Sequence, residues 1–203
     1  MKRTSYHNHG FTLVELLVSS VLLGVLLASL FFVYRMVASA WHKTSAQGEL
    51  LGQSQVISGR VKSELEQSSP KSLTISADQR AVSFLSAVQD GNLVTNLEGK
   101  AEWQTYIIYY YSSTDQKIYR REEALSAGDP EKDSPGPIEE FGPADPLVDY
   151  LNGGRVVLEN VTQAEFTSSA PNLVSFSFGT EKIRYGREDP ETSELSTTVH
   201  LRN

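Results

Sequence analysis

The sequence predicts an α+β protein in which one long N-terminal helix, membrane-spanning in its first half, packs on an antiparallel β-sheet. Three observations support this prediction. The run from Leu16 to Tyr34 is apolar and carries no charge, and no proline interrupts the chain between Phe11 and Ser69. Beyond Pro70, apolar residues alternate with polar ones, which is the period of a strand. A helix followed by a series of strands is typical of an α+β domain.

The helix becomes amphipathic after its apolar run. Leu50, Ile57, Val61 and Leu65 recur at helical spacing, and the charged residues lie mostly off this stripe. Such a stripe predicts packing of the helix on its own domain. Strands are expected after the helix, at residues 73–75, 81–85, 103–111, 117–121, 155–161, 164–167, 173–178 and 195–201.

Composition limits the classes of function. The chain has 203 residues, which is room for one membrane helix and one modest domain. Its formal net charge is -7, and an acidic soluble part disfavours nucleic acid, whose phosphates require Lys and Arg. The chain contains no cysteine, so disulfides and thiolate metal sites are excluded.

The start of the apolar run carries the strongest functional signal, the junction Gly10-Phe11-Thr12-Leu13-Val14-Glu15. A lone carboxylate in a membrane segment costs about 2.5–3.5 kcal/mol at bilayer depth, so Glu15 is expected to have a partner. Cleavage after Gly10 would leave a free amine on Phe11. The corresponding amine of a neighbouring subunit is the partner that we predict for Glu15.

This junction and the apolar residues that follow it resemble the N-terminus of type IV pilins and type II secretion pseudopilins. The resemblance implies that a prepilin peptidase cuts between Gly10 and Phe11 and then methylates the Phe11 amine. It also implies assembly with other pilin or pseudopilin subunits through the N-terminal helix. The tyrosine-rich hairpin, the segment Val156–Val161 and the C-terminal tail look like the larger minor pilins of the PilW and GspJ type.

The resemblance divides the chain into a leader, residues 1–10, and a membrane or filament-core half of the helix, residues 11–34. An amphipathic half, residues 35–69, and a β-rich domain, residues 70–203, follow. The implied location is a single pass through the inner membrane, with the leader in the cytoplasm and the domain in the periplasm or outside. The subunit then enters a pilus or pseudopilus, with an assembly platform and an ATPase acting indirectly.

Two simpler explanations of the apolar run fit the sequence less well. A secretory signal peptide has an apolar core of about 7–15 residues and a small-residue cleavage site, and this run is longer and lacks that exit. An ordinary single-pass anchor fits the length, because about 20 apolar residues span a bilayer. A plain anchor does not explain why Gly10 precedes Phe11 or why Glu15 stands at the start of the run.

Other residues give weaker signals. The histidines, His7, His9, His42 and His200, lack the spacing of a zinc site, and no nucleophile motif indicates an enzyme. A proline-rich acidic segment, residues 126–146, predicts a long, mobile surface loop. Within it, Asp129, Glu131 and Asp133 alternate as calcium ligands can, but the EF-hand register then fails. The preferred interpretation is a solvated acidic loop that holds no cofactor. A calcium site is the alternative.

The tyrosines of segment 103–111 could form an aromatic binding strip, namely Tyr106, Tyr109, Tyr110 and Tyr111. Both faces of this strand are apolar or aromatic, so we predict that the tyrosines belong mainly to the core. The predicted function is a non-enzymatic structural subunit, a minor pilin or pseudopilin. The alternatives are a filament-tip adhesin or DNA-uptake module on the same anchor, and an anchored envelope protein that never polymerises.

Overall fold

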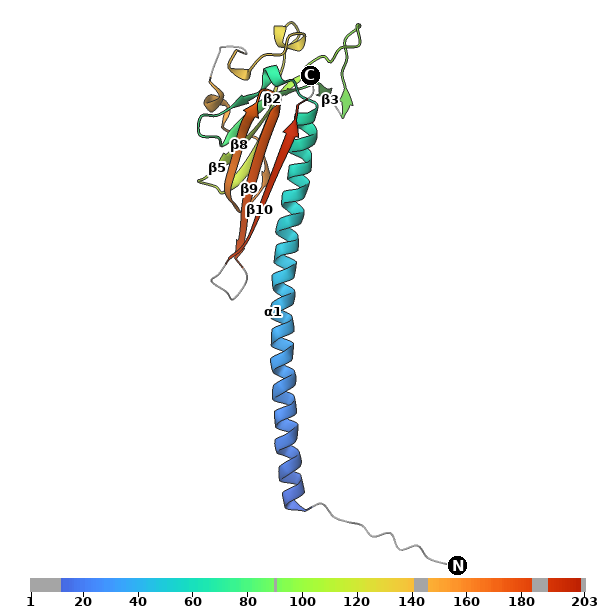
Figure 1. Ribbon diagram of the computed structural model, residues 1–203, viewed down its shortest axis with the longest axis vertical. Helices are drawn as coiled ribbons and strands as arrows, with labels where there is room; N and C mark the ends of the chain where they lie inside the picture. The colour runs from blue at the N-terminus through green and yellow to red at the C-terminus, as the bar shows by residue number, and fades with distance from the viewer. Residues whose placement is uncertain (1–11, 90, 141–145, 184–189, 202–203) are drawn as a thin grey trace, which may run out of the picture. The chain divides into compact units, whose positions relative to one another are not determined.

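The computed structural model describes residues 12–89, 91–140, 146–183 and 190–201, and it confirms the α+β fold class. Along these residues the chain forms one long α-helix, α1, followed by β-strands and short 3₁₀ helices (Figure 1). The chain divides into two units, residues 1–45 and residues 46–203.

The helix α1 spans Leu13–Glu66, close to the limits that the absence of proline predicted. It is followed by a 3₁₀ helix, η1, at Pro70–Ser72, whose N-cap is Ser69. Pro70 cannot continue a preceding α-helix, because its ring removes an N–H donor and clashes with the preceding turn. The sequence therefore defines both the course of α1 and its end.

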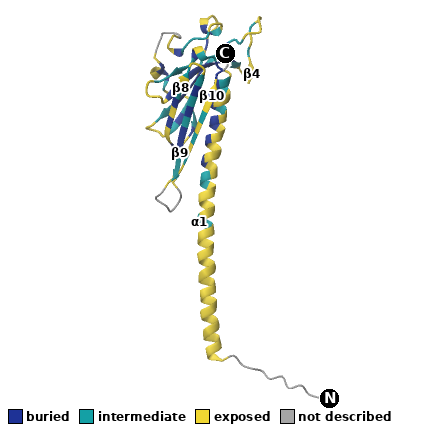
Figure 2. Ribbon diagram, in the orientation of Figure 1, coloured by how far each residue is buried: buried dark blue, intermediate teal, exposed yellow. Residues whose placement is uncertain are grey.

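In the first unit, the described residues after Thr12 are helical and almost all exposed (Figure 2). The large apolar side chains from Leu13 to Val37 are between 50% and 80% exposed. Among the described residues, α1 is the one helix that is long and apolar enough to cross a membrane. A surface of this kind requires lipid or other apolar helices around it.

The second unit contains two main antiparallel sheets. Within the described part of the chain, the larger sheet has the strand order β1-β2-β5-β6-β7, and the smaller one β10-β9-β8. The larger sheet comprises β1 Thr74–Ile75, β2 Ala81–Ser86, β5 Thr105–Ser112, β6 Lys117–Ala124 and β7 Arg155–Leu158. The smaller sheet comprises β8 Val161–Ala170, β9 Leu173–Ile183 and β10 Pro190–His200, and a separate hairpin pairs β3 Val88–Gln89 with β4 Asn92–Leu93.

The predicted amphipathic stripe of α1 is buried in the main core. Ile57, Val61 and Leu65 join a cluster that also contains aromatic residues of β2, β8 and β9. Leu50 is buried as well. In this part α1 runs beside β10 (Figure 1), where the hydroxyl oxygens of Ser58 and Thr197 lie 3.0 Å apart.

The central strand β5 is covered on both faces, as the sequence predicted. Ile107 and Tyr109 point into the core that contains α1. Tyr106, Ile108 and Tyr110 point to a second core, formed with the segment that leads from β6 to β7. Alternate side chains of a strand point to opposite faces of the sheet. A strand with an unbroken apolar run therefore needs other residues packed on both faces.

Several strand limits differ from the prediction. The expected strand 155–161 is two strands, β7 and the start of β8, because the chain turns at Asn160, whose φ is +58°. Asn is one of the few residues that adopt this left-handed conformation at low cost. Strands β9 and β10 extend further than expected, toward the segment between them, and the β3–β4 hairpin was not predicted.

In the predicted surface loop 126–146, the described residues 126–140 are mostly exposed or half-buried, but Glu131 and Ile138 are buried. The segment and its continuation contain the 3₁₀ helices η2 Pro130–Lys132, η3 Ile138–Glu140 and η4 Leu147–Tyr150. Ile138, Leu147 and Tyr150 are buried against the second face of the larger sheet. Ile138, within the proline-rich segment, and Leu147 and Tyr150, just after it, therefore cover β5. Residues 141–145 lie outside the described residues.

Candidate functional site

The predicted cleavage and methylation site precedes α1 in the sequence. Gly10 and Phe11 themselves lie outside the described residues, which begin at Thr12. The part of the site that the structure describes is therefore Thr12, Glu15 and the apolar helix surface that follows them.

Thr12 and Glu15 form a capping box at the start of α1. The Glu15 backbone N–H donates to the Thr12 hydroxyl oxygen at 3.3 Å, and the Thr12 backbone N–H donates to Glu15 Oε2 at 3.0 Å. The Thr12 hydroxyl also donates to Oε2, at 3.1 Å. This reciprocal arrangement satisfies two backbone donors that a helix start otherwise leaves unpaired. The sequence signal for this capping box is Thr-x-x-Glu, which residues 12–15 contain and which the sequence prediction missed.

The capping box occupies only one of the two carboxylate oxygens of Glu15. Among the described residues, Oε1 of Glu15 accepts no hydrogen bond, whereas Oε2 accepts two. An ionised carboxylate has about four acceptor positions. Glu15 can therefore cap its own helix and still bind a cation through Oε1.

The second unit contains a charged cluster around Glu64 that the sequence did not predict. Arg120 of β6 lies 3.1 Å from Glu64 Oε1, and Arg60, one helical turn before Glu64, donates to the same oxygen at 3.0 Å. The Tyr109 hydroxyl donates to Glu64 Oε2 at 2.7 Å. Arg120 also pairs with Glu122. Burial, together with the charge of Glu64, raises the pKa of Tyr109 well above its usual range.

This cluster lines a cleft of about 970 Å³, with the β3–β4 hairpin on the other side. The charged residues at the cleft are Arg60, Glu64, Arg120 and Glu122, and they neutralise one another through the ion pairs just described. Because these charges are paired between α1 and β6, the cluster fits a structural role, joining helix to sheet.

The candidate calcium ligands are not gathered around one point. The Asp129 carboxylate accepts a hydrogen bond from the Ser126 backbone N–H at 2.6 Å, and Glu131 is buried in η2. A solvated Glu131 was therefore the wrong expectation. Across the described ranges, no group of three or more His, Asp or Glu side chains is arranged to hold a metal ion. His42 and His200 are both exposed, and His7 and His9 lie outside the described residues.

The prediction that the tyrosines belong mainly to the core is confirmed. Tyr106, Tyr109 and Tyr110 are buried, and Tyr111 is half-buried. Their hydroxyl groups have partners within the domain: Tyr106 donates to the Gly136 carbonyl at 2.8 Å, and Tyr111 to the Thr162 carbonyl at 3.0 Å. Burial also raises the pKa of Tyr106. These rings hold the sheet to its covering segments.

Comparison with known proteins gives a match in the N-terminal segment of the chain. Residues 6–31 match the family model described as the prokaryotic N-terminal methylation motif, and this segment contains Gly10, Phe11 and Glu15. No curated protein and no solved structure matches the chain. Proteins with this motif are structural subunits rather than enzymes, and the narrower resemblance to the PilW and GspJ type stays a prediction. The N-terminal segment therefore carries a prokaryotic N-terminal methylation motif, which supports a type IV pilin-like precursor that is cleaved and methylated.

Proposed function

We propose that this chain is a minor pilin or pseudopilin, a structural subunit that enters or primes a type IV pilus or a type II secretion pseudopilus. The observation that supports this proposal most directly is the state of Glu15. It is the single acid at the start of an exposed apolar helix, and among the described residues only one of its carboxylate oxygens takes part in capping.

In this proposal Glu15 binds the N-terminal amine of a neighbouring subunit. Prepilin peptidase cuts after Gly10, and methylation of the Phe11 amine keeps its positive charge. In a bundle of apolar helices such a pair is attractive, and either partner alone is strongly penalised. The pair therefore sets the axial shift between subunits, while the exposed apolar surface between Leu13 and Val33 holds the helices together.

The same proposal defines where the chain acts. Before assembly the apolar part of α1 spans the inner membrane, with the leader in the cytoplasm and the second unit in the periplasm or outside. Its partners are prepilin peptidase and other pilin or pseudopilin subunits. The assembly platform and its ATPase act on it indirectly, when the subunit leaves the membrane.

The capping box allows a specific test of the ion pair. A Gln side chain can replace Glu in the box but carries no charge. We expect Glu15→Gln to be cleaved normally and to be absent from the sheared filament fraction. Thr12→Ala is the matched control, since it loses the cap, at a cost of about 1 kcal/mol, and keeps the charge. It should be incorporated. The measurements are the mass of the N-terminal peptide and the amount of chain in sheared filaments.

Normal incorporation of Glu15→Gln would contradict the pairing mechanism. Gly10→Val serves as the control for processing, and it should retain residues 1–10; an unchanged mature mass would contradict the proposed cleavage site. An intact N-terminus in the unsubstituted chain, together with indifference to Glu15, would indicate an anchored envelope protein instead. Ligand binding by the second unit would favour an adhesin or DNA-uptake module.

A further inference from the structure

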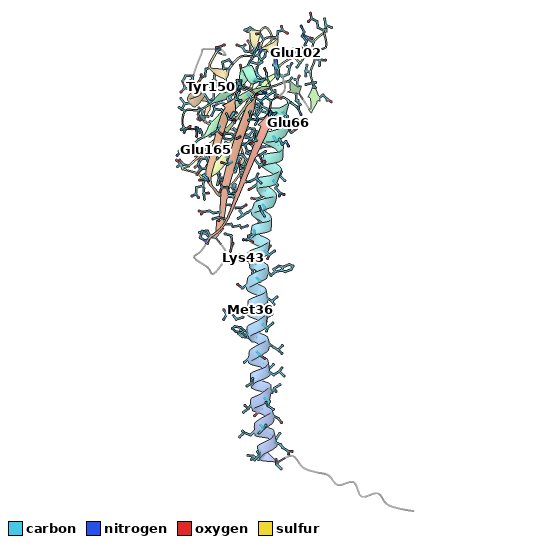
Figure 3. All side chains as sticks on the ribbon, in the orientation of Figure 1. Met36, Lys43, Glu66, Glu102, Tyr150 and Glu165 are labelled. Atoms are coloured by element: carbon cyan, nitrogen blue, oxygen red, sulfur yellow. The ribbon has the colours of Figure 1, made fainter. Side chains whose placement is uncertain are left out.

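The helical segment that follows the apolar run combines aromatic and cationic side chains. Tyr34, Trp41 and Lys43 are exposed, as are Arg35 and His42, and all five lie in the first unit. Trp41 is 74% exposed and Tyr34 70%, although both carry large apolar rings. Figure 3 labels Met36 and Lys43 in this stretch of α1. Nothing in the filament proposal uses these residues.

The spacing of these residues along α1 determines which face of the helix each side chain occupies. Tyr34 and Trp41 are seven residues apart and share one face, and Arg35 and His42 share the adjacent face at the same spacing. Side chains of a helix lean toward its N-terminus, so Trp41 and Lys43 lean back toward the apolar run. Aromatic rings beside cations are typical of a helix at a membrane–water interface.

The charges and the length of the helix agree with this location. With His42 counted as neutral, the charged side chains between Glu15 and Glu49 are Arg35 and Lys43, both cationic. From Thr12 to Tyr34 a helix rises about 33 Å, slightly more than the hydrocarbon thickness of about 30 Å. With the capped end of α1 at one headgroup layer, Arg35 reaches the opposite layer.

We propose that the segment Tyr34–Lys43 is an interfacial anchor that binds the headgroups of anionic phospholipids. Arg35 and Lys43 pair with the phosphates, and the rings of Tyr34 and Trp41 lie at the depth of the headgroups. Positive side chains at such a surface favour anionic lipid about fivefold each. The anchor explains why the cationic residues Arg35 and Lys43 follow the apolar run. It rests on membrane insertion of α1 and not on filament assembly.

Fluorescence of the full chain in lipid vesicles tests the proposed depth. The chain has two tryptophans, and Trp103→Phe leaves Trp41 as the single reporter. Lipids that carry bromine near the headgroup should quench Trp41 more strongly than lipids brominated near the bilayer centre. The matched control is Val25→Trp in a Trp41→Phe, Trp103→Phe background, which should show the opposite preference, because Val25 lies in the middle of the apolar run.

The same reporter tests the lipid class. At equal mole fraction, brominated phosphatidylglycerol should quench Trp41 more strongly than brominated phosphatidylcholine, with an enrichment of about fivefold or more. Arg35→Gln with Lys43→Gln should remove this preference, and salt should weaken it. Both substitutions are at exposed sites, so circular dichroism of the second unit should not change.

Two results would overturn the proposal. One is quenching of Trp41 mainly by deep probes, or by neither probe while the Val25→Trp control is quenched by deep ones. The other is equal quenching by the two lipids, or a preference that the double substitution does not alter. Failure of the Val25→Trp control would show instead that α1 does not insert, which would also remove the membrane step from the proposed function.

Discussion

Two acidic residues on neighbouring turns of α1, Glu64 and Glu66, form ion pairs that differ in how far they are buried. Glu64 contacts Arg120, whose side chain is only 10% exposed, and it also accepts the Tyr109 hydroxyl. The pair of Lys62 with Glu66 is 3.9 Å long and about half exposed at both ends. Exposed pairs contribute little, whereas removal of one partner of a buried pair leaves a charge without compensation.

We therefore expect Glu64→Gln to lower the free energy of unfolding by about 1–3 kcal/mol, because Arg120 and Tyr109 lose a shared acceptor of full charge. Lys62→Gln is the matched control on the same helix, and it should change stability by no more than about 0.5 kcal/mol. Urea unfolding of the full chain in detergent micelles, followed by near-ultraviolet circular dichroism, measures both. Equal effects of the two substitutions would contradict a structural role for the cluster.

At the level of elements, the start of β7 depends on two glycines with different surroundings. Gly153 and Gly154 both have positive φ, +69° and +89°. A Cβ on Gly154 would lie 2.8 Å from the Arg120 carbonyl oxygen of β6, whereas a Cβ on Gly153 would meet nothing within 4 Å. Both positions favour glycine by backbone conformation, but only Gly154 allows β7 to approach β6 closely.

Gly154→Ala should therefore destabilise the protein more than Gly153→Ala. The left-handed conformation costs a residue with a side chain about 1–2 kcal/mol, and we expect this cost at both positions. The clash with the Arg120 carbonyl adds to it at Gly154 alone, because backbone atoms cannot move aside as a flexible side chain can. Thermal unfolding of the two variants, compared with the unsubstituted chain, measures the difference. A greater loss for Gly153→Ala would mean that β7 does not pair closely with β6.

Across the whole molecule, the features that could be predicted from the sequence are those that local residue patterns specify. The course of α1, its buried stripe and the two-sided burial of β5 followed from apolar spacing and from the position of Pro70. The Glu64 cluster could not be predicted, because Glu64 and Arg120 meet only when the helix packs on the sheet. The cover formed by Ile138 was missed for a similar reason, since proline and acidic neighbours conceal a single apolar residue that the sheet buries.

The division into two units leads to a prediction about the whole chain. The buried residues of α1 begin at Leu50, and the described residues before Ala46 contribute no buried side chain. A chain that consists of residues 46–203 should therefore keep its fold. Its free energy of unfolding should fall by no more than about 1 kcal/mol, because the new helix end lacks a cap. In this chain Trp103 is the only tryptophan, so its emission reports directly on the core.

A second truncation, to residues 67–203, provides the contrast. It removes Leu50, Ile57, Val61 and Leu65, and each buried side chain of this size contributes about 1.5–3 kcal/mol. Their sum is comparable to the total stability of a small domain, about 5–15 kcal/mol, so this chain should be unfolded. If residues 67–203 fold cooperatively, the helix is dispensable for the sheets. If residues 46–203 fail to fold, the apolar part of α1 supports the domain in a way that its exposed surface does not indicate.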